Sequence, residues 1–167
     1  MTVSIRPEQA GDERAIRALT DAAFHAAPHA DGDEGELVER LRRDGDLVLS
    51  LVAVNEDQAI IGHIAFSPVK AGNATGDWFQ LAPVSVIPSG QNAGIGSVLI
   101  EEGIARIRGV GAHGIALVGN PDYYARFGFT REHRLTLSDA LDPYLQILLL
   151  GDEAPSGRLT LAPAFGG

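Results

Sequence analysis

One stretch, VSVIPSGQNAGIGSVLIEEG at residues 84–103, constrains the fold more than any other part of the chain. An apolar, strand-like run ends at Pro88, three glycines follow (Gly90, Gly94 and Gly96), and a helical pattern then begins. The first N–H groups of a helix have no acceptor within the helix, and glycines let an anion approach them without a Cβ in the way. The stretch therefore predicts a strand–turn–helix unit that can hold an anion on backbone N–H groups.

Two common nucleotide-binding patterns do not fit this turn. No Lys-Ser/Thr pair follows the glycines, as a P-loop requires. Leu99 stands where the dinucleotide-binding fingerprint has its third glycine. On the turn alone, a tight strand-to-helix connection without a ligand stays open as the structural interpretation.

The composition fits one globular domain, which we expect to span residues 1–167. Of 167 residues, 45% are hydrophobic and none is cysteine, so disulfides, thiolate metal sites and cysteine nucleophiles are excluded. A net charge of −9 disfavours nucleic-acid binding, which needs many cations. The sequence has no recognisable signal peptide or membrane-spanning run, so a cytoplasmic location is expected by default.

Hydrophobic periodicity predicts a chain that mixes strands and helices. Gly103 lies in the middle of the apolar stripe of the helix after the glycines, a stripe that continues to Val110, and we expect the helix to approach the sheet closely there. The tail, 151–167, is expected to pack on the sheet edge. Strands are predicted at 2–6, 47–55, 59–69, 78–87, 114–119 and 144–150. Helical segments are predicted at 12–27, from a capping box at Asp33 and Glu36 through Arg43, at 94–110 and at 122–126.

A second motif, NPDYYARFGF at residues 120–129, places two tyrosines on a short turn after a buried strand. Free tyrosine has a pKa of about 10, so it is protonated at neutral pH and can donate a proton or a hydrogen bond. Tyr124 is therefore a candidate donor, and a purely structural tyrosine is the alternative.

The two motifs follow one another in the order and on the elements typical of one family. With LAPVSVIPSGQNAGIGSVLI, LVGNPDYYARFGF and IIGHIAFSPV, the sequence resembles the GNAT superfamily of N-acetyltransferases, and more narrowly the bacterial YhbS-type acetyltransferases. The resemblance extends from SIRPEQAGD to YLQILLL. It implies an α/β fold with a central, mostly antiparallel, twisted sheet of six to seven strands flanked by helices, in which splayed central strands form the acyl-CoA cleft.

The resemblance also implies a cofactor, acetyl-CoA, and a set of residues that bind it. Tyr124 matches the tyrosine that acts as general acid toward the departing CoA thiolate. Asn120 is placed to contact the cofactor, although it stands closer to the tyrosine than in many members of the family. The backbone of Val84, Ser85 and Val86 would pair with the pantetheine arm, and the N–H groups of Gln91, Asn92, Ala93, Gly94, Ile95, Gly96 and Ser97 would hold the pyrophosphate.

The implied reaction is direct attack of an amine on the thioester while both substrates are bound. No carboxylate lies on the strand at 78–87, and Gln80 cannot take a proton. His63, inside an apolar run, is a candidate base or substrate contact because its ordinary pKa is near 6.5. A hydrogen-bonded core histidine is the alternative, and a water chain or capture of the neutral amine would also serve.

The loop after the first helix contains His25, His29, Asp31 and Asp33, but solvated loop side chains are a commoner explanation than a metal site, and no metal is expected. The leading hypothesis is an acetyl-CoA-dependent N-acetyltransferase whose partner is a small-molecule or protein amine, with no nucleic acid or membrane. A homodimer is compatible with it. The alternatives are a non-catalytic acyl-CoA-binding or sensor domain and a phosphate-binding fold for an unrelated nucleotide.

Overall fold

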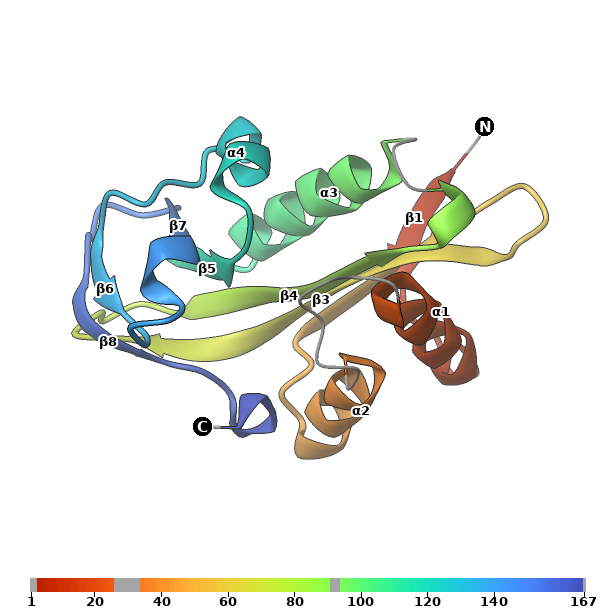
Figure 1. The fold of residues 1–167 in the computed structure, drawn as a ribbon, viewed down its shortest axis with the longest axis horizontal. Helices are drawn as coiled ribbons and strands as arrows, with labels where there is room; N and C mark the ends of the chain where they lie inside the picture. Colours follow the sequence, from red (N-terminus) through yellow and green to blue (C-terminus); the bar gives the residue numbers. More distant parts are fainter. Residues whose placement is uncertain (1–2, 26–33, 91–93, 167) are drawn as a thin grey trace. The chain divides into compact units, whose positions relative to one another are not determined.

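The computed structural model describes residues 3–25, 34–90 and 94–166, and Figure 1 shows the order of their elements. The strands are β1 (Ser4–Pro7), β2 (Leu49–Val54), β3 (Ile60–Ala71), β4 (Trp78–Val86), β5 (Gly114–Val118), β6 (Arg134–Thr136), β7 (Leu145–Leu149) and β8 (Ser156–Thr160). The α-helices are α1 (Glu13–His25), α2 (Glu34–Asp44), α3 (Ile95–Gly109) and the single turn α4 (Pro121–Tyr124).

The strands form an open mixed sheet with the order β1-β2-β3-β4-β5-β7. Strand β8 pairs with the end of β3 and with β6, off this path. Pairing is antiparallel for β1–β2, β2–β3, β3–β8 and β5–β7, and parallel for β4–β5 and β6–β8. The predicted α/β fold with a mostly antiparallel sheet is therefore confirmed, and two short strands, β6 and β8, bring the total among the described residues to eight.

Contacts between residues divide the chain into two compact units. The first unit comprises Met1–Phe66 and Ala82–Ala105, and the second comprises Ser67–Leu81 and Arg106–Gly167. Strands β3 and β4 and helix α3 contribute residues to both units.

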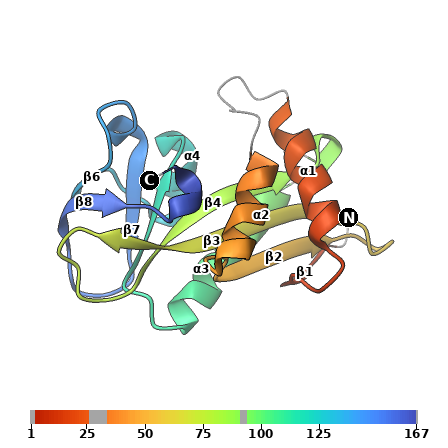
Figure 2. The same ribbon diagram turned by 90° about the horizontal axis from the view of Figure 1, so that it is seen from below.

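In the first unit, helices α1 and α2 cover one face of β2, where Ile16 and Val38 pack against Val52 and Val54 (Figures 1 and 2). The start of α3 covers the opposite face. A Cβ added to Gly103 would lie 2.6 Å from the Phe66 ring, so the predicted close approach of this helix to the sheet is confirmed.

The expectation for Val110, which we placed on the buried stripe of α3, is wrong. The helix ends at Gly109, and Val110 is 66% exposed. The prediction continues the helical repeat by one residue too many, because Val110 follows the last residue of the helix.

In the second unit, the core gathers around Trp78 of β4. A Cβ on Gly114, which is paired with Trp78 in the parallel ladder, would lie 2.3 Å from the indole ring, so the glycine makes room for it. Other members of this core are Ala71, Ala116, Leu135, Leu145, Ile147 and Leu159, from β3, β5, β6, β7 and β8.

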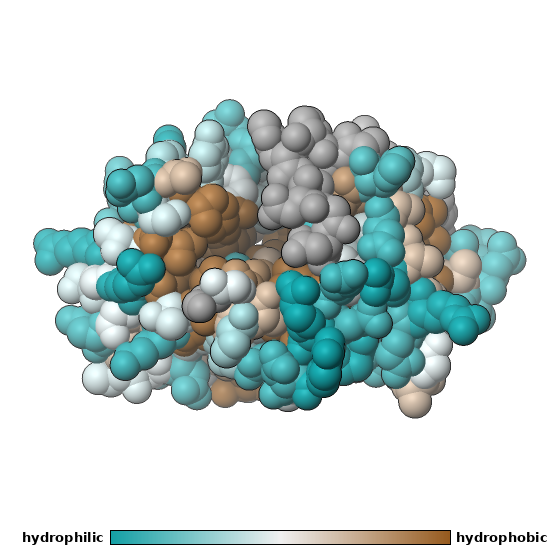
Figure 3. All heavy atoms as spheres, turned by 60° about the horizontal axis from the view of Figure 1, so that its bottom comes forward, coloured by the Kyte–Doolittle hydropathy of each residue, from teal (hydrophilic) through white to brown (hydrophobic). Residues whose placement is uncertain are grey.

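The outward surface of α1 and α2 is largely hydrophilic (teal in Figure 3). Arg17 of α1 pairs with Asp21 on its own helix and with Glu36 and Glu39 of α2. Within the described ranges, no helix is long and apolar enough to cross a membrane.

Candidate active site

Strand β4 carries the first group of predicted cofactor contacts. Ser85 is 2% exposed, and its hydroxyl is buried without a hydrogen-bond partner in the described chain, whereas Val84 and Val86 are half-buried. The parallel register between β4 and β5 ends at Gln80 and Ala116, although β4 continues to Val86 and β5 to Val118. Both strands therefore extend beyond the ladder that joins them.

The predicted anion-binding turn leads from β4 into α3. Gly94 has a φ of +82°, a conformation that favours glycine, and its carbonyl accepts a hydrogen bond from the Val98 N–H at 3.1 Å. Ile95 is buried and anchors the first turn, on which Gly96 and Ser97 are half-buried. Three further residues of the predicted turn, Gln91, Asn92 and Ala93, lie outside the described residues.

Tyr124 closes the short helix α4, directly after β5. The Asn120 side chain caps this helix by accepting a hydrogen bond from the Asp122 N–H at 2.9 Å. A Cβ on Gly119 would lie 2.6 Å from the Tyr124 ring, so this glycine lets the ring lie against the end of β5. Asn120, which is predicted to contact the cofactor, is therefore also the N-cap of the helix that carries Tyr124.

The surroundings of Tyr124 are aromatic. Its ring makes edge contacts with Tyr123 and Phe129, with centroids 5.0 and 6.0 Å away, and a tilted contact with Phe127. Burial raises the pKa of Tyr124 to about 12, and Tyr123 adds to the shift. The hydroxyl makes no hydrogen bond within the described part of the chain, so the protonated tyrosine is a donor without an acceptor among those residues.

His63 lies in the middle of β3 and is 0% exposed. Its Nε2 lies 2.8 Å from the Ser50 hydroxyl, and its Nδ1 is buried without a hydrogen-bond partner among the described residues. Burial lowers the pKa of His63 to about 4; Glu8 acts to raise it, and Arg42 to lower it. The ring is therefore neutral at neutral pH, able to accept a hydrogen bond but poorly suited to keep a proton.

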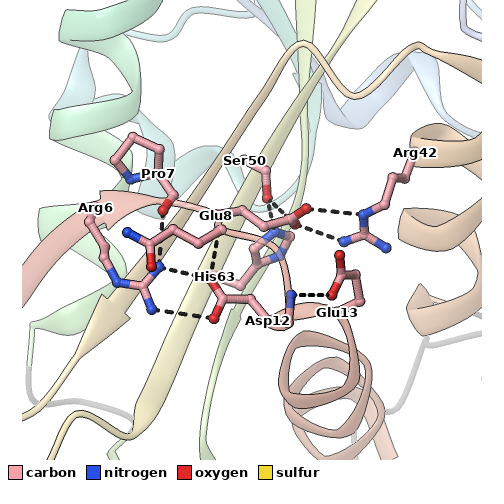
Figure 4. A network of polar contacts seen from close by, with 10 residues as sticks. Arg6, Pro7, Glu8, Asp12, Glu13, Arg42, Ser50 and His63 are labelled. Carbon is pink, nitrogen blue, oxygen red and sulfur yellow. Dashed lines mark hydrogen bonds and ion pairs between the residues drawn. The ribbon is translucent and has the colours of Figure 1, made fainter.

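The partners of His63 form a network that the sequence did not indicate (Figure 4). Ser50 donates to Glu8 at 2.8 Å, and Arg42 donates to both oxygens of that carboxylate at 2.7 and 3.0 Å. Burial acts to raise the pKa of Glu8, but the bonds from Arg42 and Ser50 outweigh it, so the pKa is lowered. Glu8 directly follows β1, and its partners lie on α2, β2 and β3, which no local pattern in the sequence connects.

The structure thus brings the predicted residues together in two groups. His63, Val84–Val86 and the described part of the glycine turn belong to the first unit, and Asn120 with Tyr124 belongs to the second. Within the described ranges, no group of three or more His, Asp or Glu side chains could hold a metal ion. Of the loop residues considered for a metal, His29, Asp31 and Asp33 lie outside those ranges.

Comparison with known proteins identifies close similarities over nearly the whole chain. The sequence profile of the acetyltransferase (GNAT) family matches residues 13–129. The uncharacterized N-acetyltransferase YhbS of Escherichia coli is 32% identical over 156 residues, which cover 92% of this chain and 90% of YhbS.

Two solved structures share the fold at higher coverage. A GNAT family acetyltransferase from Brucella melitensis, in complex with acetyl-CoA, is 43% identical, with a TM-score of 0.86 over 98% of both chains. The crystal structure of E. coli YhbS in complex with CoA is 29% identical, with a TM-score of 0.90 over 99% of this chain and 92% of that one.

Proposed function

Because the chain belongs to the GNAT family of acetyltransferases, we propose that it transfers an acetyl group from acetyl-CoA to a primary amine. The observation that carries the choice of cofactor is the similarity to the Brucella melitensis protein, which was crystallised with acetyl-CoA. The amine would attack the thioester directly while both substrates are bound, giving an amide and CoA.

The proposed cofactor site follows the chain from β4 into α3. The backbone at Val84–Val86 would bind the pantetheine arm, and the N–H groups of residues 91–97 would bind the pyrophosphate. Helix α3 has 15 residues, so its N-terminus carries a full helix dipole that favours an anion. This binding needs no cationic side chain, which suits a protein of net charge −9.

Tyr124 is proposed as the group that meets the departing thiolate. A thiolate with a pKa of about 8.5 is a weaker base than a tyrosinate, so proton transfer from Tyr124 is uphill. The raised pKa therefore keeps the proton on Tyr124, which would stabilise the thiolate by donating a hydrogen bond while charge develops on sulfur.

The assay for this proposal measures thiol release from acetyl-CoA with four amines: spermidine, glycinamide, tyramine and an Nα-blocked lysine peptide. Tyr124→Phe keeps the ring and removes the donor, and we expect turnover to fall by about 10- to 100-fold, at the low end for acid–base groups because the thiolate leaves easily. Tyr123→Phe is the matched control, with turnover close to that of the unmodified protein. Equal turnover in both variants would remove the role assigned to Tyr124.

One observation favours a second candidate, a non-catalytic acyl-CoA-binding domain. Strand β4 carries no carboxylate, and the only described histidine on the neighbouring β3 is fully buried. This candidate predicts heat on calorimetric titration with CoA but no thiol release with any of the four amines. Heat with ATP or NAD and none with CoA would contradict both candidates.

A further inference from the structure

The hydrogen bonds around His63 fix which of its nitrogens carries the proton. Ser50 has one hydroxyl proton, and its oxygen lies 2.8 Å from Glu8 Oε1 and 2.8 Å from His63 Nε2. An ionised carboxylate only accepts hydrogen bonds, so the hydroxyl proton points to Glu8. The Ser50 oxygen must then accept, and His63 Nε2 must carry the hydrogen that it receives.

The other ring nitrogen is left as a bare acceptor. In the Nε2–H tautomer, Nδ1 carries a lone pair and no hydrogen. This atom is buried and has no hydrogen-bond partner in the described ranges. Buried acceptors in folded proteins are nearly always satisfied, so this one requires a partner beyond the described residues, either a bound water or a ligand.

The chain that fixes the tautomer is itself rigidly held. Arg42 donates to both oxygens of Glu8, a fork geometry that fixes the plane of the carboxylate. His63 is paired across the sheet with Val52, on the face where Val52 and Val54 meet α1 and α2. An apolar side chain would complete that core without any of these polar groups, so packing alone does not account for them.

We propose that Glu8 and Ser50 are positioning residues that hold His63 in the Nε2–H tautomer, so that Nδ1 accepts a hydrogen bond from an N–H of the acceptor amine. The inference rests on the proposed acetyl transfer and deepens it, because it names the group that recognises the acceptor. A neutral primary amine has both an N–H for this contact and a lone pair for attack on the thioester. The contact would orient that lone pair.

The tautomer is tested without any substrate, by ¹⁵N NMR of the histidine rings, with His63→Gln used to assign the signal. We expect the Nδ1 signal of an unprotonated nitrogen and an Nε2 bonded to hydrogen at neutral pH. Ser50→Ala should give a mixture of tautomers, whereas Asp12→Asn, which breaks the neighbouring ion pair with Arg6, should not change the signal. A hydrogen on Nδ1 in the unmodified protein would overturn the inference.

The contact with the amine is tested with two isosteric variants. The amide of His63→Gln lies near Nε2 and can still meet Ser50, whereas the amide of His63→Asn lies near Nδ1 and keeps an acceptor there. With the amine of the panel that turns over fastest, we expect kcat/KM to fall by about three- to tenfold in His63→Gln and by less in His63→Asn. Equal losses in both variants, matched by equal losses of thermal stability, would mean a structural role only.

The outcome stays distinguishable from failure of the proposed function. If no amine turns over, the same four amines are titrated into the CoA-bound protein and the Nδ1 signal of His63 is followed. A shift of that signal with any amine supports the contact even without acetyl transfer. No shift with all four amines would overturn the contact, whatever CoA binding shows.

Discussion

Burial shifts the pKa values of His63 and Tyr124 in opposite directions. Burial lowers the pKa of His63 to about 4 and raises that of Tyr124 to about 12, so each keeps its uncharged form at neutral pH. Their surroundings differ: the His63 ring is held by a chain of hydrogen bonds that ends on an ion pair, whereas the Tyr124 ring packs against other aromatic rings. A hydrogen-bond chain fixes a tautomer, whereas ring packing fixes a position and leaves the hydroxyl available.

The largest effect that separates the two sites is expected on acidification. The pKa of His63 is about 4 in the folded protein and about 6.5 in the unfolded chain. Between these two pH values the unfolded chain therefore binds more protons than the folded protein. Stability is therefore present above about pH 6.5 and is lost as the pH falls toward 4, by about 3 kcal/mol in total. Glu8, whose pKa is lowered, adds a loss of the same sign at the acid end of this range.

Urea unfolding at a series of pH values from neutral to about 4.5 measures this loss. His63→Gln does not titrate in the window, so its free energy of unfolding should depend on pH much less steeply than that of the unmodified protein. Tyr124→Phe should follow the unmodified protein over the same window. If His63→Gln kept the full slope, burial of the neutral ring would not be its cause.

A smaller effect is expected when the ionic end of the His63 network is removed. Glu8→Ala leaves the Arg42 guanidinium and the Ser50 hydroxyl without their carboxylate. The ion pair is largely shielded from solvent, because the Glu8 side chain is 15% exposed and the Arg42 side chain 26%. We expect urea unfolding of Glu8→Ala to show a loss of about 2 kcal/mol in the free energy of unfolding, between the values for exposed and buried ion pairs.

The neighbouring ion pair between Arg6 and Asp12 provides the matched control. It has the same 2.7 Å separation and similar exposures, 28% and 14%, but no bond leads from it to His63. In double-mutant cycles with His63→Leu, which cannot bond to Ser50, Glu8→Ala should couple by about 0.5 kcal/mol or more, and Asp12→Ala should be additive within error. Additivity in both cycles would mean that the network does not act as one unit.

The same contrast explains what the sequence could and could not predict. The strand and helix around Gly94 and the short tyrosine turn depend on neighbours within a few residues, and periodicity reveals such features. The close approach at Gly103 is a contact with the distant Phe66, but a glycine within an apolar helical stripe is enough to predict it. Strand β6 has only three residues, too few for a period to show. The contacts of His63 with Ser50 and of Ser50 with Glu8 span 13 and 42 residues, and only the tertiary fold brings these side chains together.

The smallest effect is expected for the stability of Tyr124→Phe at neutral pH. Burial raises the pKa of Tyr124 by disfavouring the tyrosinate, and this does not stabilise the protonated form that the folded protein already holds. The hydroxyl has no hydrogen bond to a described residue, and phenylalanine keeps the edge contacts with Tyr123 and Phe129. Thermal or urea unfolding should therefore change by no more than about 0.5 kcal/mol. A loss of 1 kcal/mol or more, roughly that of a typical hydrogen bond, would show that the hydroxyl is bonded in solution and is not held ready for a ligand.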